Sequence, residues 1–291
     1  MKSRGLYFIL SGSSARKLKR GHGNLLGGRA ERFELHPLVS AEIPDFSLSR
    51  ALNHGLLPRH YLSEEPVRML RAYVGDYLRE EILAEALCRN IQAFSRFLEV
   101  SALSNGELIQ YQNIASECGV SAPTVKEYYQ ILVDTLLGRF LPSYRKKAKR
   151  RVIGAPKFYF FDVGVVSSLT RRQKVEPGTE LFGRAFEHFL FLEISAYSDY
   201  SGKFYPLTYW RTTSGFEVDF ILGDNEVAIE AKATKLVQDA HLKGLRAFRE
   251  EFKTRRAIVV SLDPNLRKLS SGIEIMPWNT FLSDLWAGKI V

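Results

Sequence analysis

The stretch FEVDFILGDNEVAIEAK, residues 216–232, contains two short apolar segments joined by a turn. Apolar and charged residues alternate in both segments, which is typical of strands with one apolar face and one charged face. The Gly-Asp-Asn turn at residues 223–225 is a strong hairpin signal. The hairpin predicts that Asp219, on the first strand, meets Glu230 on the second, where Glu230 and Lys232 share a face.

This pair of carboxylates favours a metal-dependent chemistry. Two adjacent carboxylates repel each other unless a divalent cation lies between them, and Mg²⁺ prefers one or two carboxylates completed by water and phosphate oxygens. We therefore expect Asp219 and Glu230 to be Mg²⁺ ligands. Lys232 can orient or deprotonate water, or stabilise negative charge on a phosphate, and Glu187 can support a ligand water or the lysine. The alternative is a strand pair whose charged face is simply solvated.

The hairpin lies within a predicted α/β unit that begins at Gly183. Glu187 belongs to an amphipathic helix over 183–197, upstream of the hairpin. The other elements that the pattern predicts are strands over 207–211, 217–222 and 227–233, a helix over 239–251 and a strand over 257–262.

Upstream, residues 112–162 predict a helix-turn-helix followed by a hairpin. A helix over 112–118 ends at Gly119, and a second helix over 123–137 is capped by Ser121. Strands over 139–144 and 157–161 flank a basic stretch. In a winged helix of this order the second helix enters the major groove and the wing meets phosphates, so DNA is the expected partner. The predicted DNA contacts are Thr124, Lys126, Gln130, Arg145, Lys146, Lys147, Lys149, Arg150 and Arg151.

This winged helix could instead pack against a neighbour without touching nucleic acid. The charge distribution favours DNA. The formal net charge is +9, yet residues 1–30 and 141–157 each carry seven basic side chains and no acidic one. The remaining 244 residues have a net charge of −5, so the basicity is confined to two patches.

Cysteine usage and hydropathy indicate the compartment. Cys88 and Cys118 lack CxxC spacing and read as free thiols in a reducing cytosol. No apolar run approaches the roughly 18 to 20 residues that span a bilayer. We therefore expect a cytoplasmic protein with no membrane partner.

The N-terminal half predicts strands and then helices. Residues 6–10 form an apolar run that ends in the polar loop 11–14, which suits a buried strand. Residues 32–38 are a second strand candidate that ends at Pro37. Residues 64–103 carry helical periodicity.

Two family resemblances rest on these motifs. Asp219 followed by Glu230-Ala231-Lys232, behind a helix bearing Glu187, resembles the core of the PD-(D/E)xK nuclease-like fold. The series FILSGSS at 8–14, GR at 28–29, LHPL at 35–38 and KFYFFDVG at 157–164, ahead of that core, resembles AAA-type ATPases with a C-terminal DUF4143 domain.

The second resemblance implies roles for the N-terminal loop. By that similarity, residues 11–14 match the sensor-1 segment, with Ser11 and Ser13 on the γ-phosphate side of a nucleotide site. Arg29 matches the place of an arginine finger, whose cation stabilises the charge of a transferring phosphoryl group.

The chain departs from this family at its start. It has neither a GxxxxGK[ST] loop nor the acidic strand that precedes sensor 1, and GNLLGGRA at 23–30 has Arg29 and Ala30 where the loop needs lysine and a hydroxyl. ATP is therefore expected as a cofactor only if the missing part is supplied. An upstream start, self-association or a partner chain could supply it.

The sequence thus predicts an α/β and α+β chain in four parts. These are a remnant of an AAA-type core over 1–45, a helical lid or linker over 46–105, a winged helix-turn-helix over 106–164, and a DUF4143-like nuclease-fold domain over 165–291. The predicted function is DNA binding with an Mg²⁺-dependent nuclease-like domain and no complete ATP site. The alternatives are a non-catalytic remnant or assembly module, or an ATPase if the true start lies upstream.

Overall fold

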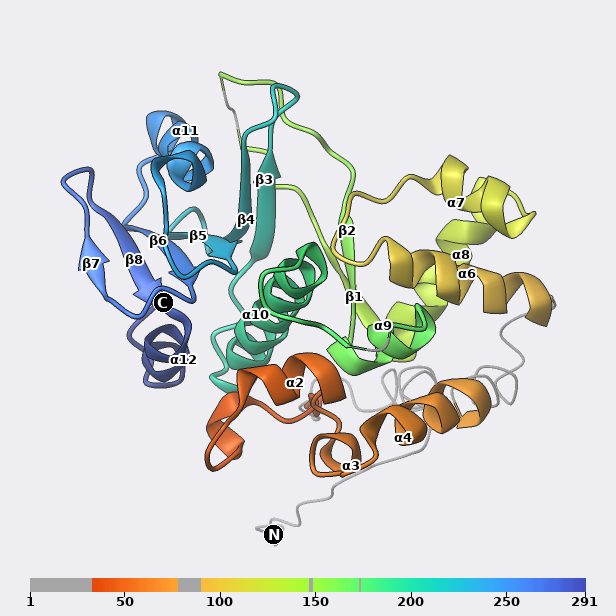
Figure 1. Ribbon diagram of the computed structural model, residues 1–291. Coiled ribbons are helices and arrows are strands. Elements are labelled where there is room, and N and C mark those ends of the chain that lie inside the picture. Colours follow the sequence, from red (N-terminus) through yellow and green to blue (C-terminus); the bar gives the residue numbers. More distant parts are fainter. Residues whose placement is uncertain (1–32, 78–89, 147–148, 173) are drawn as a thin grey trace, which may run out of the picture.

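The computed structural model describes residues 33–77, 90–146, 149–172 and 174–291 (Figure 1). The predicted strand at 6–10, the nucleotide-site residues Ser11, Ser13 and Arg29, and Lys147 lie outside these residues. The described part is mixed α/β, with a helical region and a small hairpin followed by a mixed sheet covered by helices. None of its helices is both long and apolar enough to cross a membrane.

The helical region precedes the sheet in the chain. Its elements are η1 (Ser40–Glu42), α2 (Leu48–His54), α3 (Pro58–Tyr61), α4 (Pro66–Ala72), η2 (Tyr73–Tyr77), α6 (Ile91–Leu103), α7 (Tyr111–Cys118), α8 (Ala122–Asp134), β1 (Gly138–Leu141), β2 (Lys157–Phe160) and α9 (Val163–Leu169). The predicted helix-turn-helix and hairpin are confirmed. Gly119 ends α7 at a left-handed φ of 67°, and the Ser121 hydroxyl caps α8 by accepting from the Thr124 backbone N–H.

The C-terminal region is built on a six-stranded sheet of order β3-β4-β5-β6-β8-β7. Its elements are α10 (Glu180–Tyr200), β3 (Leu207–Arg211), β4 (Glu217–Leu222), β5 (Val227–Lys232), η3 (Asp239–Leu242), α11 (Lys243–Glu251), β6 (Arg256–Ser261), β7 (Arg267–Lys268), β8 (Ile273–Pro277) and α12 (Trp278–Trp286). The β3, β4 and β5 strands are antiparallel neighbours, whereas β5, β6 and β8 run parallel.

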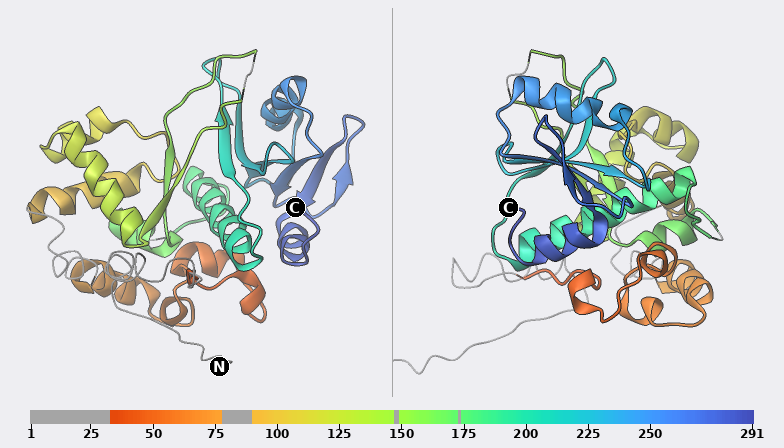
Figure 2. Two further views of the ribbon diagram at one scale, coloured as in Figure 1. Left: turned by 180° about the vertical axis from the view of Figure 1, so that it is seen from behind. Right: turned by 60° about the vertical axis from the view of Figure 1, so that its left-hand side comes forward.

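Helices cover both faces of this sheet (Figure 2). The α10 and α12 helices pack on the face that carries Phe220, Ile229 and Ile258, and α11 packs on the face that carries Val218 and Val259. Burial on both sides explains why β6 is an almost continuous apolar run.

The β1–β2 hairpin joins the helical region to the sheet. Beyond β1, the Tyr144 backbone N–H donates to the Tyr209 carbonyl of β3 over 2.7 Å, and on the returning arm the Ile153 N–H donates to the Arg211 carbonyl over 2.8 Å. Both arms of the extended hairpin therefore lie along β3, and the described basic residues of the stretch, at 145–146 and 149–151, lie between them.

The strand predicted at 32–38 is wrong over its described part. Residues 33–38 adopt no strand, because their polar side chains bind other elements and Pro37 offers no N–H for a ladder. Glu34 binds Arg139 at 2.5 Å and His36 binds Asp199 of α10 at 2.7 Å.

Candidate functional site

The β4–β5 hairpin brings the two predicted metal ligands together. Its register pairs Phe220 with Ile229. Asp219 and Glu230 come directly after this last pair, where the pairing of β4 with β3 shifts its register. Asp219 Oδ2 accepts a 2.8 Å hydrogen bond from the Ala231 N–H, which fixes that carboxylate against the neighbouring strand. Both carboxylates are buried, with 5% and 6% of their residue surfaces exposed.

The Glu230 carboxylate is only half satisfied. Its Oε1 lies 2.6 Å from Lys232 Nζ, whereas Oε2 is buried and has no hydrogen-bond partner among the described residues. A buried carboxylate oxygen without a partner is costly. Burial, and then the charge of Asp219, raise the pKa of Glu230 well above its ordinary value, against the opposing effect of Lys232.

Asp219 has a similar electrostatic environment. Burial first, and then Glu187, raise the pKa of Asp219 to about 6, while Lys232 and Lys157 act in the other direction. The resulting pair of neighbouring carboxylates takes up a proton readily, and a divalent cation could take the place of that proton.

The fourth predicted residue, Glu187 of α10, is held by the β1–β2 hairpin. Its Oε1 accepts from Lys157 Nζ at 3.1 Å and from the Tyr159 hydroxyl at 2.5 Å. Lys157 Nζ also lies 2.8 Å from Glu217 Oε1. Burial alone would raise the pKa of Glu187, but Lys157 and the Tyr159 hydroxyl hold it below its ordinary value.

Three further residues contact the site without having been expected from the sequence, namely Lys157, Tyr159 and Glu217. Lys157 is the clearest omission, since it is 3% exposed and bridges two acids from separate elements. The sequence does contain one indication, because Lys157 is the first residue of the apolar strand KFYF and a buried ammonium needs acidic partners. The position of those partners depends on how the hairpin packs on α10, which no local pattern contains.

The predicted α8 contacts lie on an accessible helix face. Lys126 and Gln130 are exposed and Thr124 is half-buried. Lys126 Nζ lies 5.2 Å from the centre of the Tyr111 ring, and Gln130 donates to Asp134 on the same helix at 2.9 Å. These contacts leave the outer face of α8 open to a partner.

The predicted wing is partly neutralised by the chain's own acids. Arg150 pairs with Glu250 at 2.5 Å and with Glu251 at 2.8 Å, both at the end of α11, and Lys146 pairs with Asp224 in the β4–β5 turn. Other described basic residues of the stretch remain exposed, namely Arg145, Lys149 and Arg151.

The described residues contain no group of three or more His, Cys, Asp and Glu side chains placed to hold a metal ion. A cation at this hairpin would therefore have two protein carboxylates, Asp219 and Glu230, and would complete its shell with water and phosphate oxygens. Mg²⁺ accepts such a set. The unpartnered Glu230 Oε2 also fits a cation.

Two family models match the chain in tandem. Residues 45–176 match DUF8612, a domain of unknown function, and residues 182–281 match DUF4143, another domain of unknown function. The chain contains a DUF4143 domain. No ATPase or nuclease family model matches, and neither a curated protein nor a solved structure matches the chain.

The DUF4143 assignment confirms that part of the predicted resemblance. The ATP-site roles of Ser11, Ser13 and Arg29 stay predictions. The DUF8612 match runs from before α2 to beyond α9 and contains the predicted winged helix. The carboxylates and Lys232 therefore belong to DUF4143, whereas Lys157 and Tyr159 come from DUF8612, so the site lies at the junction of the two.

Proposed function

We propose that this protein binds DNA and hydrolyses its phosphodiester bonds with Mg²⁺ held by Asp219 and Glu230. The observation that carries the proposal is a pair of buried carboxylates on neighbouring strands, Asp219 and Glu230. Glu230 Oε2 has no hydrogen-bond partner in the described part of the chain, while Glu230 Oε1 lies 2.6 Å from the Lys232 ammonium. When bound, Mg²⁺ would polarise a phosphate oxygen and lower the pKa of a water ligand.

Each side chain of the site has a role in this proposal. Asp219 is fixed by the Ala231 N–H, and Glu230 presents its unpartnered oxygen. Lys232 balances their charge and can stabilise negative charge that builds on a phosphate. Lys157 and Tyr159 keep Glu187 ionised and oriented, so Glu187 can accept a hydrogen bond from water near the lysine.

A cleavage assay with two variants of the site and one control variant tests the activity. Labelled duplex, branched and single-stranded DNA are incubated with Mg²⁺ or Mn²⁺. We expect Glu230→Gln and Lys232→Met to abolish cleavage, and Glu226→Gln, which changes an exposed acid of the same hairpin, to leave it intact. Equal cleavage by all variants would contradict the proposal and indicate a contaminating nuclease.

Metal binding can be measured without activity. Mn²⁺ is titrated into the protein and the free ion is followed by electron paramagnetic resonance. We expect Asp219→Asn and Glu230→Gln to weaken binding at least tenfold, since each removes one of two anionic ligands. Unchanged Mn²⁺ affinity in both variants would remove the metal from the mechanism.

A second function has one observation in its favour. Arg150 and Lys146 of the predicted wing are paired with acids of the same chain, as expected of a module that binds proteins rather than DNA. Duplex affinity distinguishes the two functions, because phosphate binding weakens steeply as salt rises. A salt-independent affinity, or no binding at ~50 mM salt, would favour the protein-binding module.

A further inference from the structure

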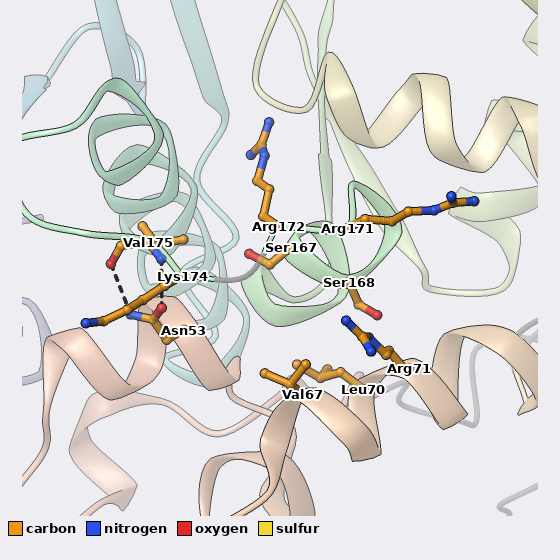
Figure 3. A pocket seen from close by; sticks show the side chains of 10 residues that line it. All are labelled: Asn53, Val67, Leu70, Arg71, Ser167, Ser168, Arg171, Arg172, Lys174 and Val175. Atoms are coloured by element: carbon orange, nitrogen blue, oxygen red, sulfur yellow. Dashed lines mark hydrogen bonds between the residues drawn. The ribbon is translucent and has the colours of Figure 1, made fainter.

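A shallow basic groove lies between α4, α9 and the segment that follows α9 (Figure 3). In the described part of the chain, four cationic side chains line it and no acidic one does. A second cavity shares Ser167, Arg172 and Val175 with it and extends it to Arg184 of α10. The four cationic residues are Arg71, Arg171, Arg172 and Lys174.

These cations are poorly neutralised. Among the described residues, neither Arg71 nor Arg172 makes an ion pair with an acid. Burial, and then the charge of Arg184, lower the pKa of Arg172, and only the weaker effect of Glu180 acts in the other direction. Arg171 and Lys174 do have acidic partners, Glu99 at 3.7 Å and Glu176 at 3.2 Å, but these are exposed pairs of little net strength.

The shape of the groove limits its ligand. The enclosed volume is about 20 Å³, room for about one water molecule, so a ligand must lie across the groove. Arg71 extends toward Ser168, whereas Arg171, Arg172 and Lys174 extend in different directions (Figure 3). A single phosphate cannot meet cations arranged in this way, but a chain of phosphates can meet them in succession.

We propose that this groove binds the phosphate backbone of duplex DNA. Duplex DNA presents about one negative charge per 1.7 Å of its axis, which suits cations spread along a surface. The inference rests on the DNA binding proposed above and adds a contact surface separate from α8 and the 145–151 stretch. The Ser167 and Ser168 side chains line the same groove and offer hydroxyl donors to phosphate oxygens.

The test compares two arginines on one helix. Arg71→Ala removes a groove cation of α4. Arg68→Ala, the control, removes an arginine of α4 that is 85% exposed and paired with Glu65 outside the groove. Binding of a fluorescent duplex is followed by anisotropy over a series of salt concentrations. We expect Arg71→Ala and Arg172→Ala each to weaken binding and to lower the slope of log affinity against log salt by about one.

Several outcomes would overturn the inference. The inference is wrong if Arg71→Ala and Arg172→Ala bind the duplex with the same affinity and salt dependence as Arg68→Ala. It is also wrong if the parent protein does not bind the duplex. If instead the groove variants lost affinity for inorganic triphosphate alone, the groove would be a small-anion site and not a DNA surface. Arg71→Lys, which keeps the charge, should retain the slope of the parent and so exclude misfolding as the cause.

The nuclease proposal can fail independently. Weakened duplex binding in the groove variants, with no cleavage by any protein, would support the groove and contradict the nuclease. Cleavage that depends on Glu230, with duplex affinity insensitive to Arg71 and Arg172, would contradict the groove alone.

Discussion

Two neighbouring residues of α10, Glu187 and His188, differ in their charge state. Glu187 is ionised because Lys157 and Tyr159 of β2 bind its carboxylate. His188 is 1% exposed, and its Nε2 lies 2.6 Å from the Phe160 carbonyl, a geometry in which the imidazole N–H donates. Burial lowers the pKa of His188 to about 4. The imidazole is therefore neutral at pH 7 and has a structural role.

The His188 pKa predicts acid sensitivity. Its ordinary value is 6.5 and its folded value is about 4, so the folded state resists protonation. The associated stability is complete above pH 6.5 and is lost as the pH falls through 4, by about 3 kcal/mol. Urea unfolding of the parent and of His188→Gln at pH 7 and pH 4 measures this loss.

We expect His188→Gln to lose about 3 kcal/mol less than the parent between those pH values, because glutamine can still donate to the Phe160 carbonyl. His241→Gln is the control, since His241 is only half-buried. If the parent and His188→Gln lost the same free energy of unfolding between pH 7 and pH 4, other groups would be the cause of the acid sensitivity.

Some residues of the candidate site can be predicted from a local sequence pattern, and others cannot. The hairpin signal of residues 216–232 is local, so the sequence alone places Asp219, Glu230 and Lys232 on neighbouring strands. The predicted alternation is wrong in β4, because a register shift puts Val218 and Phe220 on opposite faces of the sheet. The ion pair of Lys157 with Glu187 joins residues 30 positions apart and depends on tertiary packing. No periodicity in the sequence encodes such a contact.

At the scale of elements, the β1–β2 hairpin is a structural part of the candidate site. Lys157 bridges Glu187 of α10 and Glu217 of β4, and its ammonium lies 5.5 Å from the centre of the Tyr209 ring. The hairpin thus supplies the positive charge that the surrounding acids need. A wing that contacted only DNA would not require this buried lysine.

Removing this lysine should destabilise the protein. Lys157→Met leaves Glu187 and Glu217, each about a quarter exposed, without their shared cation. We expect a loss of about 2–4 kcal/mol in the free energy of unfolding, somewhat less than for a fully buried pair. Lys146→Ala, which breaks an exposed ion pair with Asp224, should cost less than about 1 kcal/mol.

A double variant identifies the cause of that loss. Glu217 keeps its ion pair with Arg211 at 3.2 Å in the Lys157→Met variant, so the uncompensated charge is mainly that of Glu187. Adding Glu187→Gln removes this charge, and part of the stability should return in a double-mutant cycle. If the losses of stability in the two single variants simply added in the double variant, the Lys157–Glu187 ion pair would not be the cause of the destabilisation. Unfolding in urea, followed by circular dichroism, measures all four proteins.

Elements with a strong local signal were predicted well. The strands at 207–211 and 217–222 match β3 and β4 to the residue, because their apolar runs end at clear turn residues. The β8 and α12 elements were not predicted. Their segment is IEIMP followed by WNTFLSDLW. Its hydrophobic patterns are too short to predict a strand and a helix, which form by packing on β6 and α10. The wrong strand at 32–38 has another cause. Its polar residues Glu34 and His36 bind Arg139 and Asp199, while its apolar residues Phe33 and Leu35 are exposed.

At the scale of the whole molecule, the two family matches share a core. A single apolar cluster contains Leu52 of α2, Leu141 and Tyr159 of the hairpin, and Phe189 and Phe220 of the DUF4143 domain. The hairpin arms add backbone hydrogen bonds to β3. Domains that share a core and a strand edge are expected to unfold together, unlike domains joined by a small polar interface.

Two probes on opposite sides of the junction test this cooperativity. All three tryptophans, Trp210, Trp278 and Trp286, lie in the C-terminal region, so their fluorescence reports on the DUF4143 side. Cys118 of α7 is fully buried, and in a Cys88→Ser variant it is the single thiol, so its reactivity reports on the helical side. Cys118 lies in the helical region's own apolar cluster, and β2 connects that cluster to the shared core, since Phe158 and Phe160 belong to the first and Tyr159 to the second. We therefore expect the fluorescence change and the exposure of Cys118 to have the same urea midpoint and the same slope. If the Cys118 thiol reacted at a urea concentration where tryptophan fluorescence was still native, the helical region would be an independent unit. The Lys157–Glu187 pair would then be a contact between separable domains, free to open when a ligand binds one of them.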